Sequence, residues 1–276
     1  MKTTKTKRGF TLIELSLATV FLAVLLLMIA TITINVSAIY QKGLSLRNVN
    51  ATGRTLIDDF DRAIADAPLI RFTTSQDNYF RTRTGQAMVK RTNSSGKEER
   101  SQIDVQYSGA FCSGRYSYVW NTGYILNSES YETTADPLKL KYKINDQSIE
   151  KDDIRLIKFA DSSRAACQNW KEGSSTLDIS SSSTPLTDEP EELLSVADTQ
   201  IELALYELNV FPATQDSVSL RSFYSGTFIL ATLTGDVNIK SEGDYCNPAD
   251  DQSLAGDFNY CAVNKFNFAA QASGKK

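Results

Sequence analysis

The longest apolar segment of the chain lies close to its N-terminus. From Leu15 to Ile34 there are 20 residues without a charge, and their only polar side chains are hydroxyls. At 1.5 Å per residue, a helix of this length spans roughly 30 Å, the thickness of a bilayer's hydrocarbon core. The apolar region of a secretory signal is usually shorter and leads to a small-residue cleavage site. The pattern therefore predicts a membrane-spanning helix.

Cations flank this segment unequally. The first nine residues hold four cations, Lys2, Lys5, Lys7 and Arg8. After them, the next Lys or Arg is Lys42. By the positive-inside rule, the first residues lie in the cytoplasm and everything after Tyr40 lies outside.

The helical pattern continues beyond the span. Leu56, Ile57, Phe60 and Ile64 recur on one face, as in an amphipathic helix. Pro68 disfavours a helical residue before it and lacks a backbone donor, so it ends the pattern. We expect a helix from Phe10 to about Asp66, with residues 10–40 in the membrane and residues 41–67 as an amphipathic second half.

The rest of the chain, residues 68–276, is rich in strand patterns. Residues 138–144 alternate strictly between apolar residues and lysines, as a half-buried antiparallel strand does. Residues 71–100 indicate hairpins or loops, and residues 269–276 a frayed end. The expected strands are Ile103–Ser108, Tyr116–Trp120, Leu138–Ile144, Ile154–Phe159, Gln200–Phe211, Val218–Tyr224, Thr227–Thr234 and Val237–Lys240.

A Ser-, Pro- and acid-rich stretch, residues 172–192, interrupts the strand patterns. Its composition is typical of a flexible loop or linker. It either divides residues 68–276 into two lobes or is a long insertion in one sheet. In both cases we expect the strands after it to close the sheet begun before it.

Two groups of residues suggest ligands, each with a plainer explanation. Residues 71–100 hold seven cations and three acids, with Phe72, Tyr79 and Phe80 among them, which would suit DNA. A solvated polar face is favoured, and the whole chain is acidic, with 29 Lys and Arg against 33 Asp and Glu. The second group consists of four aromatic residues that could bind a sugar or a surface ligand: Tyr116, Tyr118, Trp120 and Tyr124. A half-exposed sheet face is the favoured interpretation.

Nothing in the sequence indicates an enzyme. There is no histidine, no phosphate-binding glycine loop and no G-x-S-x-G sequence. We therefore expect a structural or binding protein without a cofactor.

The residues that open the apolar segment carry the most specific signal. Gly9-Phe10-Thr11-Leu12-Ile13-Glu14 resembles the class III signal of type IV pilins and type II secretion pseudopilins. The resemblance implies that residues 1–9 are a leader, that prepilin peptidase cuts after Gly9, and that Phe10 becomes an N-methylated first residue. It also implies that Glu14 pairs with the terminal amine of a neighbouring subunit during assembly, where each buried charge compensates the other.

This resemblance implies a pilin-like α+β fold, in which a long N-terminal helix packs on an antiparallel β-sheet head. Residues 55–67 are similar to the stalk of PilW-like or J-type minor pilins. The implied function is that of a minor subunit of a type IV pilus or pseudopilus. It would be stored in the cytoplasmic membrane with its head outside and later assembled into the filament.

The implied partners are other pilin subunits, met through the N-terminal helix, prepilin peptidase, the inner-membrane assembly platform and, before assembly, membrane lipid. Two alternatives share the anchor. One is a tip module whose head binds DNA, a surface or an export substrate. The other is a single-span protein that is never cleaved.

Four cysteines lie in the region expected outside the cytoplasm: Cys112, Cys167, Cys246 and Cys261. An even number there suggests two disulfides, for which three pairings exist. We expect the nearest-neighbour pairing, Cys112–Cys167 and Cys246–Cys261. The second of these loops resembles the C-terminal disulfide loop of many pilins. The alternative is that all four are reduced and buried.

Acidic residues surround Cys246 in the C-terminal tail. Carboxylates in a closed loop would suit Ca²⁺, which some pseudopilins bind in such loops. The spacing is not that of an EF-hand, and a plain acidic loop is favoured over a site formed by Asp244, Asp250, Asp251 and Asp257.

Overall fold

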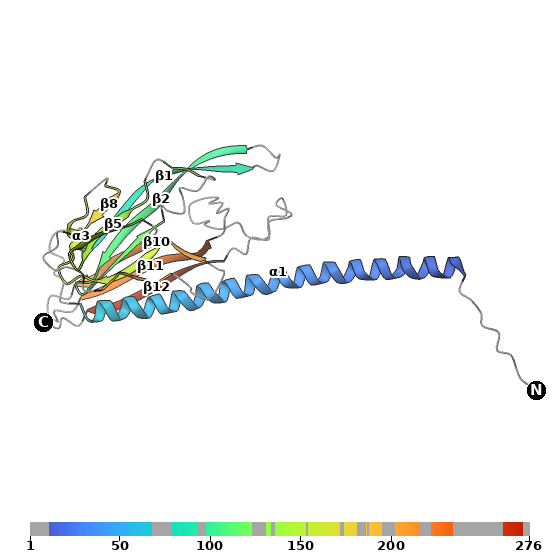
Figure 1. The fold of residues 1–276 in the computed structure, drawn as a ribbon. Helices are drawn as coiled ribbons and strands as arrows, with labels where there is room; N and C mark the ends of the chain where they lie inside the picture. The colour runs from blue at the N-terminus through green and yellow to red at the C-terminus, as the bar shows by residue number, and fades with distance from the viewer. Residues whose placement is uncertain are drawn as a thin grey trace, which may run out of the picture. The chain divides into compact units, whose positions relative to one another are not determined.

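A computed structural model of the chain contains two compact units, residues 1–44 and residues 45–276. The structure describes residues 11–67, 79–92, 98–122, 131–133, 136–152, 154–171, 174–180, 186, 188–194, 202–215, 222–233 and 262–272. Within these, a long N-terminal helix precedes a series of mainly antiparallel strands, so the fold is α+β (Figure 1).

The helix α1 is continuous over 54 residues, Leu12–Ala65, close to the expected bounds. In the first unit, every described side chain from Thr11 to Leu44 is exposed. In the second unit, α1 buries one face, which includes Val49, Leu56, Phe60 and Ile64. The predicted apolar stripe is therefore confirmed. Leu56, Phe60 and Ile64 follow one another at intervals of four residues, and all three are buried in the second unit.

In the described part of the chain, the strands form three sheets, one of six strands and two of three. The largest has the order β4-β1-β2-β3-β7-β9, and every pairing in it is antiparallel. Its strands are β1 (Phe80–Thr92), β2 (Glu98–Cys112), β3 (Tyr116–Asn121), β4 (Tyr131–Thr133), β7 (Leu156–Ala160) and β9 (Glu191–Glu192).

The two smaller sheets lie in the same unit. The first, β10 (Glu202–Gln215), β11 (Ser222–Leu233) and β12 (Val263–Ala272), is antiparallel. The second has the order β6-β5-β8 and consists of β5 (Lys139–Ile144), β6 (Gln147–Lys151) and β8 (Thr176–Asp178), with β5 and β8 parallel. One short helix, α3 (Ala165–Gln168), follows β7.

The six-stranded sheet is covered on both faces. On one side, Phe60 of α1 is fully buried, with its ring centroid 4.9 Å from that of Tyr118 in β3 and 5.3 Å from that of Phe268 in β12. On the other side, Ala110, Val119 and Ile157 belong to a second core, which α3, β5 and β8 complete. The alternation of strand side chains thus divides the second unit into two cores.

This double coverage overturns the expected half-exposed sheet face. Tyr118 and Trp120 are wholly buried and Tyr116 is half-buried, while Tyr124 lies outside the described residues. Tyr118 and Trp120 are core residues and present no open surface to a sugar.

The expectation that the later strands close the first sheet was also wrong. The strands β10, β11 and β12 form a sheet of their own. Where β10 meets β2, the side-chain amide of Gln106 takes the place of a strand: its Oε1 accepts from Leu208 N at 2.8 Å, and its Nε2 donates to Leu208 O at 3.2 Å. One side chain thus satisfies this part of the β10 edge without a strand ladder.

Two further expectations change. The stretch 172–192 is not only a linker. Its described part contains β8, and its last two residues form β9. Each of these strands pairs with an earlier strand. The tail is not frayed from residue 269, because β12 runs to Ala272. Two expected strands, 218–224 and 227–234, are one in the described part, β11, and residues 237–240 lie outside the described residues.

Candidate functional site

The first candidate site is the beginning of α1, where the sequence predicts the processing and assembly signal. Glu14 Oε2 accepts hydrogen bonds from Thr11 N and Thr11 Oγ1, both at 3.0 Å. Thr11 Oγ1 in turn accepts from Glu14 N at 3.3 Å. These reciprocal bonds form a capping box, which satisfies two backbone donors at the first turn.

The geometry assigns Thr11 a role that the sequence interpretation missed. The signal was present, since Thr-x-x-Glu before an apolar run is the usual pattern of a capping box. Glu14 is therefore held at the very start of the helix by its own chain. Gly9 and Phe10, the predicted cleavage residues, lie outside the described residues.

The remaining polar groups of the apolar segment are satisfied within the helix. Ser16 and Thr19 donate through their hydroxyls to Ile13 O and Ser16 O, each at 2.9 Å. Thr31 and Thr33 likewise bond to carbonyls of the preceding turn, each at 2.8 Å. No hydroxyl in this group requires water, so the segment suits an apolar environment.

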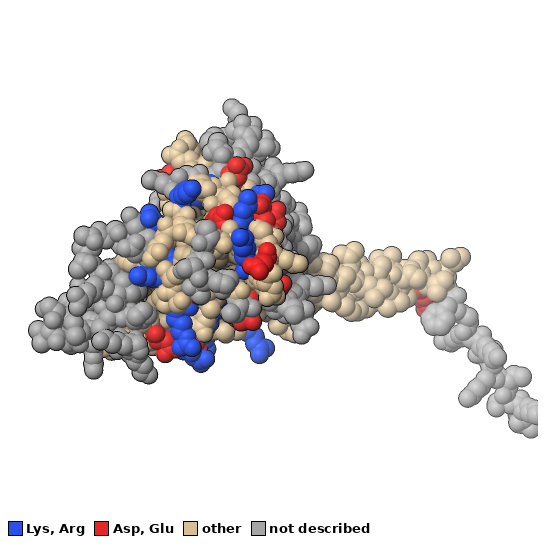
Figure 2. Space-filling view, turned by 60° about the vertical axis from the view of Figure 1, so that its left-hand side comes forward, with Lys and Arg blue, Asp and Glu red and all other residues tan. Residues whose placement is uncertain are grey.

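By length and composition, α1 is able to cross a membrane. The described part of its first unit exposes large apolar side chains at most positions from Leu12 to Leu44 and has no basic group before Lys42. On the face seen in Figure 2, the protruding part of the helix carries no Lys or Arg. A helix that is apolar on every side is typical of a buried or membrane-spanning element.

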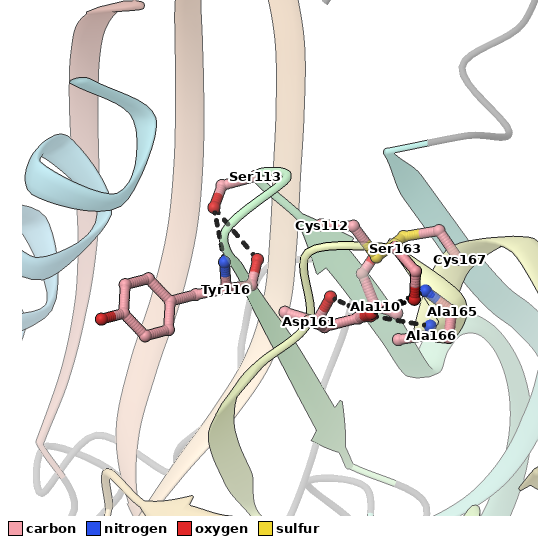
Figure 3. The surroundings of a disulfide bond; sticks show 10 residues. Ala110, Cys112, Ser113, Tyr116, Asp161, Ser163, Ala165, Ala166 and Cys167 are labelled. Carbon is pink, nitrogen blue, oxygen red and sulfur yellow. Dashed lines mark hydrogen bonds between the residues drawn. A yellow bond between two sulfur atoms is a disulfide. The ribbon is translucent and has the colours of Figure 1, made fainter. Parts of the chain in front are cut away.

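The disulfide predicted between Cys112 and Cys167 is present, with the two Cα atoms 6.2 Å apart (Figure 3). It joins the end of β2 to α3, and both residues are fully buried. Because it closes a loop of 55 residues, a chain-entropy estimate gives a stabilisation of about 4 kcal/mol. Cys246 and Cys261, and the four aspartates of the calcium candidate, lie outside the described residues.

Beside the disulfide, the buried carboxylate of Asp161 orders the turn into α3 (Figure 3). It accepts from Ala165 N at 2.9 Å and from Ala166 N at 3.0 Å. It also accepts from the hydroxyls of Ser117 at 2.8 Å and Ser163 at 3.0 Å. All of these partners are donors, so Asp161 acts as a structural cap, and the group has no open position for a substrate.

A second polar cluster ties α1 to the six-stranded sheet. Lys158 Nζ of β7 lies 2.5 Å from Asp59 Oδ1, and Tyr118 Oη donates to Asp59 Oδ2 at 2.8 Å. Lys158 Nζ also lies 4.6 Å from the ring centroid of Tyr116. Burial raises the pKa of Tyr118 well above its usual value, as does the charge of Asp59, so the phenol stays a neutral donor.

The basic stretch of residues 71–100 forms the β1–β2 hairpin in its described part. Tyr79, one of the interleaved aromatic residues, is buried in the core. Arg83 is half-buried and donates through Nη1 to Asp136 O at 3.0 Å, and burial lowers its pKa. These two side chains are therefore engaged inside the fold, which weakens the case for a DNA surface here.

Among the described residues, no group of three or more His, Cys, Asp or Glu side chains is arranged to hold a metal ion. Comparisons of the chain with protein-family models, curated proteins and solved structures give no significant match.

Proposed function

We propose that the chain is a minor subunit of a type IV pilus or of a secretion pseudopilus, cut after Gly9 and assembled through its N-terminal helix. The observation that carries the proposal is the joint position of three features. A basic leader ends at Gly9-Phe10, a capping box fixes Glu14 one turn later, and an exposed apolar helix follows without a break.

The physical argument concerns where the apolar helix is stable. In water its exposed leucines, isoleucines and valines would cost about 25 cal/mol for each Å² of apolar surface. A bilayer removes that cost before assembly, and a bundle of similar helices removes it afterwards. The second unit, with its own cores and a disulfide, suits a head outside the cytoplasm.

Glu14 fits the same proposal. A carboxylate at the end of a membrane span is costly and is functional by default. Its capping bonds to Thr11 lower that cost while the subunit is in lipid. On assembly, the amine of a neighbouring subunit would add a full opposite charge at this point.

The deciding experiment is the N-terminal sequence and intact mass of the protein purified from its own envelope. The proposal requires a chain that begins at methylated Phe10. A chain that begins at Met1 in cells with an active prepilin peptidase would contradict it, and residues 1–40 would then be an ordinary anchor.

A further inference from the structure

Four strands of the six-stranded sheet contribute one side chain each to a single row beside α1. The register pairs Phe111 of β2 with Tyr118 of β3, and Tyr118 with Lys158 of β7. It also pairs Lys158 with Glu191 of β9. Residues directly opposite one another on antiparallel strands point to the same face of the sheet. For this row it is the face that meets α1, because Phe111 and Tyr118 share a core with Phe60.

Asp59 of α1 meets this row at Lys158. Its Oδ1 lies 2.5 Å from Lys158 Nζ, and its Oδ2 accepts a hydrogen bond from Tyr118 Oη at 2.8 Å. The next residue, Phe60, is fully buried, with its ring centroid 4.9 Å from that of Tyr118. The core therefore fixes the backbone that carries Asp59, and the fold holds an amine against a carboxyl group from 99 positions away.

The surroundings of this pair are largely closed to water. The side chains of Lys158 and Asp59 are 17% and 24% exposed. Lys158 Nζ lies 4.6 Å from the ring centroid of Tyr116 and 5.8 Å from that of Tyr118. Removal from water favours the neutral form of an amine and of a carboxyl group, and a neutral amine is a nucleophile.

We propose that Lys158 and Asp59 form an isopeptide bond, an amide between Lys158 Nζ and Asp59 Cγ that joins α1 covalently to β7. The ion pair is the state before the reaction, and it contains every atom of the amide and of one water molecule. Nζ attacks Cγ and forms the N–C bond. The bond between Cγ and Oδ1 breaks, and Oδ1 leaves as water with two of the three protons of Nζ. The step is neither an oxidation nor a reduction and uses no co-reactant.

Two residues of the row assist this reaction. Tyr118 Oη already donates to Oδ2, where negative charge develops when Nζ attacks Cγ. Glu191 lies directly opposite Lys158, so its carboxylate is placed to carry protons from Nζ to Oδ1. The largest contribution is the fixed geometry, since well-oriented groups in one molecule react as if at roughly 10⁵–10⁸ M.

The amide would change how α1 is attached to the strands. Salt screens an ion pair, whereas it does not weaken a covalent bond. The bond would also close a loop between residues 99 positions apart. Both residues lie in the second unit, so the reaction is independent of cleavage after Gly9 and of assembly.

The test is the intact mass of the full-length chain, purified from its native envelope and fully reduced, with its N-terminus identified in a protease digest. We expect a mass lower by one water molecule, and a branched peptide in which Lys158 is joined to Asp59. Lys158→Arg should restore the full mass, because a guanidinium stays protonated and does not attack a carboxyl group.

A second ion pair gives the matched control. Lys141 lies 3.1 Å from Glu150, and their side chains are 40% and 43% exposed. Lys141→Arg should leave the mass deficit unchanged. Glu191→Gln should lower the fraction of chains that carry the bond.

Three results would overturn the proposal: a full mass in the natural chain, a digest without the branched peptide, or a deficit that persists in Lys158→Arg. If Lys158→Arg prevents folding, the branched peptide of the natural chain decides alone. A Glu191→Gln chain that reacts to the natural extent would overturn the role of Glu191. The N-terminal peptide of the same digest reports cleavage after Gly9, so failure of the proposed function is read separately.

Discussion

Lys158 Nζ in β7 lies 2.5 Å from Asp59 Oδ1 in α1, and this contact links two residues 99 positions apart in the chain. The two side chains are only 17% and 24% exposed, so water screens the pair weakly. Together with the hydrogen bond from Tyr118, the contact fixes the end of the stalk helix on the six-stranded sheet.

Removing the charge of Lys158 should destabilise the second unit. Lys158→Met keeps the apolar stem beside Tyr116 but leaves the carboxylate of Asp59 with only the Tyr118 bond. We expect a loss of about 1–3 kcal/mol in the free energy of unfolding, measured by denaturant titration of the purified chain. The control is Arg115→Met, which breaks an ion pair whose side chains are 57% and 50% exposed, and which should cost under about 1 kcal/mol. Equal losses in the two variants would contradict the assignment.

Two glycines of α1 provide a matched pair. A Cβ at Gly53 would lie 2.2 Å from Cζ of Phe266, whose ring is buried and stacks on Phe228 at 5.0 Å. Gly53→Ala should therefore lower the stability of the second unit by about 1–3 kcal/mol, in spite of its better helix propensity.

At Gly43 a Cβ would meet nothing within 4 Å. Gly43→Ala should be neutral or stabilise the helix by up to about 1 kcal/mol. Thermal unfolding of both variants in the same detergent measures the difference. A Gly53→Ala chain as stable as Gly43→Ala would show that the helix does not pack on β12 as described.

Asp61 should give the head an unusual dependence on pH. Its Oδ1 is buried and has no hydrogen-bond partner in the described part of the chain. Burial raises the pKa of Asp61, and the charge of Asp58 raises it further. An acid whose pKa is higher in the folded state costs stability as pH rises through that value, and costs nothing below its unfolded pKa of about 3.9.

Asp61→Asn should therefore raise the melting temperature at pH 7 and leave it unchanged at pH 3. Asp58→Asn serves as a control that removes only the neighbouring charge and should have a smaller effect. A variant that is less stable than the natural chain at pH 7 would mean that the carboxylate has a favourable partner.

Much of the fold follows from local patterns in the sequence. The apolar stripe of α1 and the alternation of residues 138–144 predicted the helix and β5 because burial on one face imposes a period on the sequence. The β5–β6 turn was missed because it lacks glycine. Its two residues, Asn145 and Asp146, have φ values of 50° and 64°, which Asn and Asp tolerate in a tight hairpin.

The division into three sheets was beyond the sequence. Where β10 meets β2, the side chain of Gln106 binds the backbone of Leu208 across 102 positions of the chain. The residues next to a single glutamine in a strand do not indicate that its side chain binds a distant segment. The contact between Asp59 and Lys158 is hidden for the same reason. At the N-terminus the opposite holds, because the Thr11–Glu14 box is local and could be predicted from four residues.

The role of Glu14 in assembly can be separated from its role in capping. Glu14→Ala removes both the charge and the bonds to Thr11, whereas Glu14→Gln retains an oxygen that accepts those bonds but carries no charge. If Glu14 pairs with the amine of a neighbouring subunit, both variants should be cleaved after Gly9 and both should fail to enter filaments. Intact mass measures cleavage, and immunoblotting of sheared filaments measures incorporation. Incorporation of Glu14→Gln at the natural level would reduce Glu14 to a helix cap, and incorporation of both variants would remove it from assembly altogether.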